Sequence, residues 1–191
     1  MDQYQNLVLR IEELERRVGQ MVIRGKIAEV DPAKHVARVA YGPKGKQLTG
    51  WLQWKPMRTG KAITWWCPEV GEGVTVISEG DLALGEILPG SYHAEFPAPS
   101  DNPDEYLVLF GDGSKISHDR SSHKLVVVNQ GDVDVTAEGA VTAKAKGAIT
   151  VETEQTLTVK AASTMQLSTD ADMTLKAGGN MKLTASRIDF N

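Results

Sequence analysis

The chain has 191 residues, of which 41% are hydrophobic and 24% charged, and its formal net charge is −4. This composition is ordinary for a globular protein, and no apolar run approaches the ~18 residues of a membrane-spanning helix. The N-terminus lacks a basic start followed by an apolar block, so we expect no secretory signal. The single cysteine, Cys67, excludes an intrachain disulfide framework and is typical of cytoplasmic synthesis.

Charge and aromatic residues are unevenly distributed along the chain. Residues 21–66 carry nine Lys and Arg against two acidic residues, whereas residues 67–114 carry ten acidic residues and no Lys or Arg. All four Trp lie within residues 51–66, and residues 111–189 hold no Phe, Trp or Tyr. Because opposite charges attract, we expect the basic and acidic segments to meet, within one subunit or between subunits.

The first predicted element is a helix over residues 1–19. Its apolar residues recur at alternating spacings of three and four, which is a short heptad stripe, and they are Tyr4, Leu7, Ile11, Leu14, Val18 and Met21. Such a stripe favours packing against the same helix of other subunits, through Leu7, Ile11, Leu14 and Val18. The alternative is one amphipathic helix that lies on its own domain.

Residues 20–95 predict a small barrel. Turn segments such as DPAK, GPKGK and EVGEG separate β-rich runs at residues 22–30, 35–42, 48–55, 62–68, 73–79 and 82–90. Five or six short strands in this length are typical of an OB-fold, which often binds oligonucleotides through aromatic side chains and a basic groove. The net charge of residues 21–96 is only +1, and Trp is more often a core residue, so nucleic-acid binding is the weaker interpretation.

Residues 96–103, FPAPSDNP, indicate a linker. Residues 104–191 then predict a β-rich stalk that opens with three strands, EYLVLF, SKISHD and HKLVVVN, with Gly-Asp-Gly at 111–113 as a turn.

An eight-residue repeat extends over residues 123–186, with HKLVVVNQ as a looser first line. In each later line the third and fifth residues are aliphatic or Ala, the seventh is Ala or Thr, and the even positions are mostly polar. Because side chains alternate along a strand and eight is even, every line turns the same side inward. With Ala143, the predicted inward residues are Val133, Val135, Val141, Ile149, Val151, Leu157, Val159, Met165, Leu167, Met173, Leu175, Met181 and Leu183.

Three architectures can hold this repeat. An antiparallel meander requires hairpin turns, and the junctions lack consistent hairpin chemistry. A single-chain triangular β-helix would complete barely more than two coils, fewer than a solenoid needs. Three intertwined chains would bury the apolar row of each in a shared core. We therefore predict a mainly β homotrimer with a short N-terminal helix, an OB-fold barrel and an intertwined, triple-stranded β-helix stalk.

No motif indicates catalysis. The histidines at 35, 93, 118 and 123 form no H-x-H or H-E-x-x-H pattern, and neither Gly-Lys segment is a P-loop. His118 and His123 are a candidate ligand pair, but a solvated turn is the simpler interpretation, and Cys67 is expected to be buried and inert. We expect no enzyme activity, no cofactor and no metal ligand.

The motifs taken together resemble baseplate assembly protein V, the central spike of contractile bacteriophage tails and R-type pyocins, which is related to the spike of type VI secretion. The resemblance rests on GKIAEVDPAKHVARVAYG, WLQW, ITWWCPEVGEGVTVIS, LALGEILPGSY and DGSKISHD followed by the octads, and it covers nearly the whole chain. It implies a homotrimeric structural protein with an OB-fold collar under the tail tube. Its β-helical needle would pierce the bacterial outer membrane when the sheath contracts.

The resemblance also implies partners and a location. The partners would be tail-tube and baseplate proteins above the collar, a tip-capping protein and, transiently, the outer membrane, with no nucleic acid. The protein would be made in the bacterial cytoplasm, would join a virion or pyocin tail baseplate and would act at the envelope of the target cell.

One departure concerns the end of the needle. Spikes of this family often end in an apex where an H-x-H pair from each chain holds iron, whereas this sequence has no histidine after His123, and Ile188 and Phe190 are out of register with the octads. We therefore assign no iron ligands in this sequence. The sequence leaves open whether ions bind on the trimer axis. Either a separate protein caps a blunt needle or the apex is missing. The alternatives to a spike are an OB-fold nucleic-acid-binding module with a trimerising stalk and a fragment of a trimeric adhesin or tail fibre.

Overall fold

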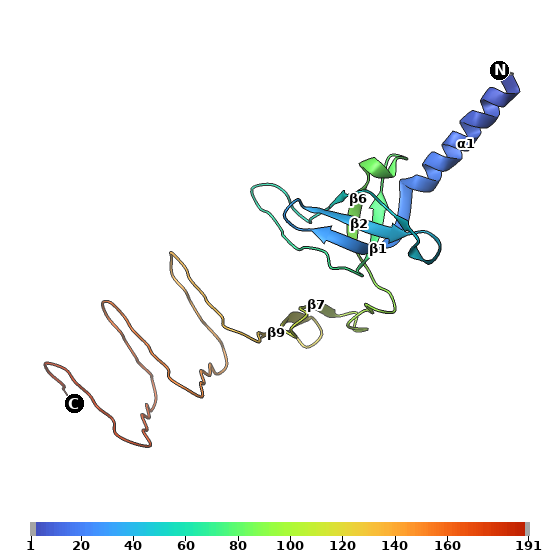
Figure 1. Ribbon diagram of the computed structural model, residues 1–191. Coiled ribbons are helices and arrows are strands. Elements are labelled where there is room, and N and C mark those ends of the chain that lie inside the picture. The colour runs from blue at the N-terminus through green and yellow to red at the C-terminus, as the bar shows by residue number, and fades with distance from the viewer. Residues whose placement is uncertain (1–2, 190–191) are drawn as a thin grey trace. The chain divides into compact units, whose positions relative to one another are not determined.

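The structure is a computed structural model that describes residues 3–189, and the chain divides into two units, residues 1–134 and 135–191. The helices and strands of the described residues belong to the first unit (Figure 1). Helix α1 spans Gln3–Met21, and residues 1–2 of the predicted helix lie outside the described residues. The helix continues through Gly19 because β1 begins directly after Met21 and holds the last turn in place.

Six strands form the first sheet: β1 (Val22–Asp31), β2 (Val36–Tyr41), β3 (Gln47–Leu48), β4 (Leu52–Trp54), β5 (Gly73–Ile77) and β6 (Glu86–Ser91). Their order is β1-β5-β6-β4-β2-β3, and an additional pairing of β1 with β2 closes a ring. The pairs are antiparallel except β4 with β6, which is parallel. This closed five-stranded ring, to which β3 adds a short edge, is an OB-like barrel, as predicted.

The long strand β1 closes the barrel because it pairs with two neighbours. Residues 22–26 pair with β5 and residues 25–31 pair with β2, with a register shift between Ile27 and Glu29 that bends the strand. Gly25 lies where the two pairings overlap, and a Cβ atom there would lie 2.4 Å from the carbonyl oxygen of Ala40. A larger residue at 25 would therefore push the crossing strands apart.

Alternating residues of the strands fill the barrel interior. The buried apolar side chains belong to Ile27, Ala37, Val39, Leu52, Trp54, Val74, Val76, Leu82 and Ile87. The buried Thr49 hydroxyl accepts a hydrogen bond from Val39 N–H at 2.9 Å and donates one to the Gly50 carbonyl at 2.8 Å. The period-two alternation in the sequence thus predicts which face of each barrel strand is buried.

Three of the runs predicted as strands differ in the structure. The run at 48–55 is divided between β3, which ends at Leu48, and β4. Residues 62–68 form a loop and not a strand. Within this loop Ile63 pairs with Thr59 through an isolated antiparallel β-bridge. Pro56 and Pro68 flank the loop and cannot donate backbone hydrogen bonds. Leu82–Leu84 form the 3₁₀ turn η2, because the Asp81 carboxylate accepts from the Ala83 N–H at 2.9 Å, and strand β6 begins only at Glu86. A second 3₁₀ turn, η1, spans Pro43–Gly45.

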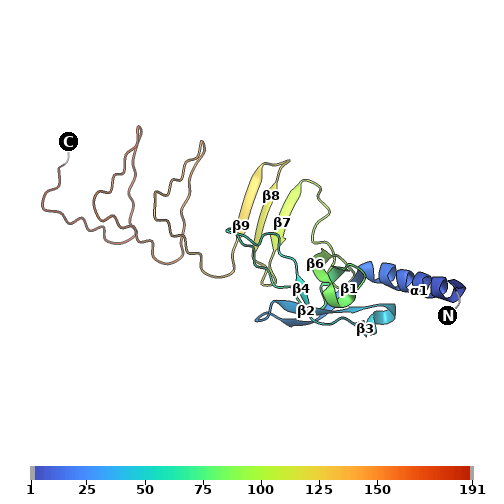
Figure 2. The same ribbon diagram turned by 90° about the horizontal axis from the view of Figure 1, so that it is seen from above.

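A separate three-stranded antiparallel sheet follows the barrel, with β7 (Glu105–Leu109), β8 (Lys115–Asp119) and β9 (Lys124–Val128) side by side in Figure 2. These are the three strands that the sequence predicts, and the Gly-Asp-Gly segment forms the turn between the first two, with Gly113 at φ +88°. Strand β9 lies within residues 123–130, the first line of the repeat, and pairs with β8 along its length.

The second unit has a regular bend pattern without strand pairing. Within its described part, residues 135–189, the chain bends at 138–139, 146–147, 154–155, 162–163, 170–171 and 178–179, once every eight residues (Figure 1). At two of these corners the seventh residue of the octad accepts a backbone hydrogen bond: Thr153 Oγ1 from Gln155 N–H, and Thr169 Oγ1 from Ala171 N–H, both at 3.2 Å. The octads of the sequence are therefore straight segments joined at corners.

We predict that Asp119 holds the turn between β8 and β9 in its ionised form. Its carboxylate accepts bonds from the Ser122 N–H at 2.6 Å, the Ser122 hydroxyl at 2.8 Å and the Asn102 amide at 2.8 Å, and these donors, led by the Ser122 N–H, lower its pKa to about 2. Because the folded pKa lies below the usual value of about 4, this contribution is present above pH 4. It is lost as the pH falls towards 2.

An NMR titration of the Asp119 carboxyl carbon tests this prediction. Asn102→Ala removes one donor and should raise the pKa of Asp119, while the fold at neutral pH stays intact. Titration of Asp119 near pH 4 in the unmodified protein would contradict the assignment.

Candidate assembly surfaces

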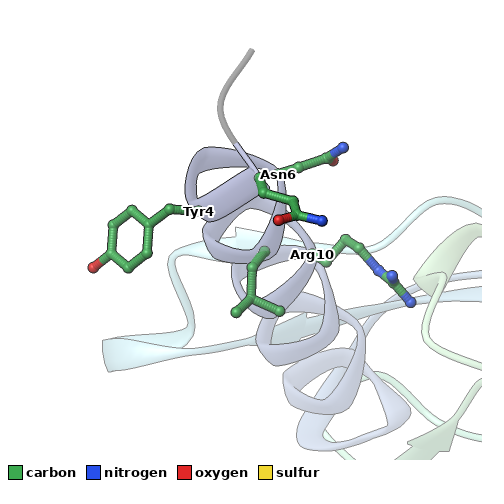
Figure 3. Close-up of a pocket in the computed structure, with 5 residues that line it drawn as sticks. Tyr4, Asn6 and Arg10 are labelled. Atoms are coloured by element: carbon green, nitrogen blue, oxygen red, sulfur yellow. The ribbon is translucent and has the colours of Figure 1, made fainter.

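The apolar stripe of α1 faces solvent in the single chain. Leu7, Ile11, Leu14 and Val18 are 55%, 47%, 57% and 64% exposed, and no residue of α1 is buried. Figure 3 shows Tyr4 on one side of the first turns, with Asn6 and Arg10 on another. The hollow there is lined by α1 residues alone, so it is helix surface and not an enclosed ligand pocket. The stripe is exposed in the single chain, and its packing against other subunits or along its own domain stays a prediction.

The helix is fastened to the barrel through its last turn. Ser78, just after β5, donates its N–H to the Met21 carbonyl at 2.8 Å and its hydroxyl to the Gln20 carbonyl at 2.7 Å, and its hydroxyl oxygen accepts the Gly80 N–H at 3.2 Å. Gly80 has φ +94°, and a Cβ atom there would lie 2.9 Å from Arg17 Cβ. These bonds satisfy carbonyls that a helix end leaves without intrahelical partners.

Three of the four tryptophans are exposed, although Trp is more often a core residue. Trp54 is 7% exposed, but Trp51, Trp65 and Trp66 are 48%, 59% and 62% exposed. Trp65 packs edge-on against His35 with ring centroids 5.1 Å apart and lies 5.5 Å from the Trp54 ring. The expectation that Trp is a core residue holds for Trp54 alone. Trp51 lies between β3 and β4, and Trp65 and Trp66 are exposed because 62–68 is a loop and not a strand. The flanking prolines were the signal that could have shown it.

Ion pairs join the basic and acidic segments within one chain. Lys26 pairs with Glu95 at 2.5 Å and Lys55 with Glu86 at 2.6 Å. Within the basic segment, Arg38 pairs with Glu29 at 3.0 Å, and its guanidinium lies 5.8 Å from the Trp51 ring centroid. The predicted meeting of the two segments is thus confirmed inside the subunit. These pairs offset part of the positive charge that would favour nucleic acid.

The predicted inward residues of the octads are all exposed in the single chain. The thirteen large ones range from 49% exposed at Met165 to 78% at Val135. The structure therefore brings no two distant octads together to cover the apolar row. The single chain alone does not bury these side chains.

The histidines and the cysteine were the remaining candidates for a metal or a reactive site. Among residues 3–189, no group of three or more His, Cys, Asp or Glu could hold a metal ion. His118 lies on β8, and His123 lies in the following turn with φ +56°. Cys67 is half-buried, and burial, followed by the nearby Glu72 and Glu69, raises the pKa of its thiol. No helix in the described residues is long and apolar enough to span a membrane.

Comparison with known proteins identifies the class of the barrel. Residues 23–92 match the family model described as the type VI secretion system/phage-baseplate injector OB domain. Over 138 residues the chain is also 36% identical to the protein named "Spike protein" of Escherichia phage P2, an alignment that covers 72% of this chain. The chain spans 64% of that relative's own length. The family match of the barrel and the alignment with a phage spike protein together support a baseplate spike protein.

We predict that the contact between α1 and Gly80 contributes to the stability of the barrel. Gly80→Ala adds a side chain at a positive φ, which costs about 1–2 kcal/mol, and also presses against Arg17. Gly90→Ala is the matched control, because Gly90 has φ +92° with nothing within 4 Å of its added Cβ. Urea denaturation should show a larger loss of the free energy of unfolding for Gly80→Ala. Equal losses would mean that the helix contact adds nothing.

Proposed function

We propose that the chain is the subunit of a homotrimeric central spike in a contractile injection baseplate. The observation that carries this proposal is the row of thirteen apolar side chains, each about half-exposed or more, which recurs in octads with a bend every eight residues. The match of the barrel to the baseplate injector OB domain and the similarity to a phage spike protein support the same role.

The size of the exposed row favours obligate assembly. Burying a large aliphatic side chain contributes roughly 1.5–3 kcal/mol, so the thirteen positions amount to tens of kcal/mol per chain before entropic costs. A monomer rarely exposes a contiguous apolar patch larger than a few hundred Å². The row is thus a strong drive to bind other copies of the same repeat.

Three copies suit the geometry of the repeat. Straight eight-residue segments joined at corners can line the three sides of a prism if each chain passes from one side to the next. Val, Ile, Leu and Met would meet near the axis, and the Ala and Thr at position seven would fill the narrow corners. Neighbouring segments would then pair as strands about 4.8 Å apart. The backbone groups left unpaired in one chain gain partners in this way.

In this proposal each region has a mechanical task. The α1 helices pack together through their exposed stripes, and the OB barrels form the collar beneath the tail tube and the other baseplate proteins. The stalk is the needle that sheath contraction drives through a bacterial outer membrane, in a phage or a pyocin, with or without a separate tip protein. Intertwined chains resist separation under load, because one chain leaves only by breaking many strand layers. The role uses no active site, cofactor or nucleic acid.

We predict that the protein is a homotrimer in solution. Light scattering coupled to size exclusion should give about three times the chain mass of 20.7 kDa at micromolar concentration. The expected cause is the burial of the octad row between chains. A monodisperse monomer would overturn both the trimer and the spike proposal.

We predict that Val151→Asp prevents assembly whereas Thr150→Asp, one residue earlier, does not. Val151 belongs to the inward row, so the variant would place three carboxylates near the axis without partners, at several kcal/mol each. Thr150 lies on the opposite face of the same segment and serves as the matched control. Light scattering of both variants compares the trimer fractions. Equal assembly would show that the inward face has been assigned to the wrong parity.

A further inference from the structure

The charged residues of the first octads alternate in sign at intervals of eight. The sixth position of consecutive octads holds Lys144, Glu152 and Lys160, and the eighth position holds Glu138, Lys146 and Glu154. All six are exposed in the single chain, and the ion pairs found among the described residues include none of them. The eighth-position charges lie at the corners, where the chain bends.

The alternation in sign indicates which octads can lie on neighbouring strands. The offset below is the number of octads by which two neighbouring strands differ in their place along the repeat. An offset of one octad makes four pairs of opposite sign and none of like sign, namely Glu138–Lys146, Lys146–Glu154, Lys144–Glu152 and Glu152–Lys160. An offset of two octads makes four pairs of like sign instead, namely Glu138–Glu154, Lys144–Lys160, Glu154–Asp170 and Lys160–Lys176. Like charges directly opposite on neighbouring strands are destabilising, and opposite charges are stabilising.

An offset of three octads, which a single-chain triangular coil would require, is less favourable than an offset of one. It pairs Glu152 with Lys176 and Lys146 with Asp170, and places the other four charges of the set beside uncharged residues. The charges therefore select the neighbouring octad, eight residues away. Within one chain, consecutive octads are separated by a corner and lie on different sides of a prism. The neighbour at this offset must therefore come from a second copy of the chain.

We propose that an inter-subunit ladder of ion pairs holds the upper stalk, in which each octad of one subunit lies beside the next octad of the adjacent subunit. This inference rests on the proposed trimer and specifies its strand order. Each chain would occupy successive sides of the prism, one layer further along at every corner. The ladder covers residues 138–160, directly after the three-stranded sheet, and fixes the axial register before the less charged octads pair.

Disulfide trapping in the full chain tests the strand order. In a Cys67→Ala background, Lys144→Cys with Glu152→Cys should form a covalent trimer on oxidation, seen on a non-reducing SDS gel. Neighbouring strands lie about 4.8 Å apart, which a disulfide spans. Lys144→Cys with Lys160→Cys is the control, because two strand layers exceed the reach of a disulfide, and it should remain unlinked.

Light scattering of the same variants before oxidation separates the two hypotheses. A trimer that links through residues 144 and 152 supports the inference. A trimer that does not link there, or that links equally in the control, overturns the strand order and leaves the spike proposal standing. A monomer overturns the trimer itself and the inference with it.

Charge reversal tests the ladder as a source of stability. Glu152→Lys should speed dissociation of the trimer in unheated SDS, because residue 152 would then face two lysines. Lys144→Glu and Lys160→Glu, added to Glu152→Lys, restore the alternation and should restore the slow rate. Asp172→Lys is the matched control, because its neighbours at the one-octad offset, Thr164 and Asn180, are uncharged. Equal rates for Glu152→Lys and the control would overturn the ladder.

Discussion

The apolar row that one chain leaves in solvent is the constraint on which the architecture depends. Because eight is even, each octad presents its large side chains on the same face, and no octad of this chain covers another. In the proposed trimer, folding of the C-terminal half and assembly would be one process. The barrel differs, since it closes on itself and buries its own core before any partner arrives.

How far the sequence predicts the structure depends on whether a pattern has a local cause. β-rich runs between turn segments identified most of the barrel strands, because strand propensity and turn residues are local properties of the sequence. The loop at 62–68 was predicted wrongly because a run of β-formers such as Ile63 and Trp65 looks the same in a strand and in a loop whose prolines deny it ladder partners. The exposure of Trp65 and Trp66 follows from that error, whereas Trp51 lies outside the loop.

The same reasoning applies to the assembly surfaces. The heptad spacing predicted a helix with an apolar stripe, and within this subunit the last turns of the helix contact Ser78 and lie close to Gly80. The ion pairs from Lys26 to Glu95 and from Lys55 to Glu86 join residues far apart in sequence. The separation of charge along the sequence predicted that the basic and acidic segments meet. Which residues form ion pairs depends on the barrel topology.

The direct passage from α1 into β1 has a mechanical consequence. Met21 ends the helix and Val22 begins the strand, with the Met21 carbonyl bonded to Ser78, so no flexible residues separate the two elements. A hinge would absorb torsion, whereas this connection transmits it. A torque applied to α1 is therefore passed to strand β1 of the barrel without an intervening flexible linker.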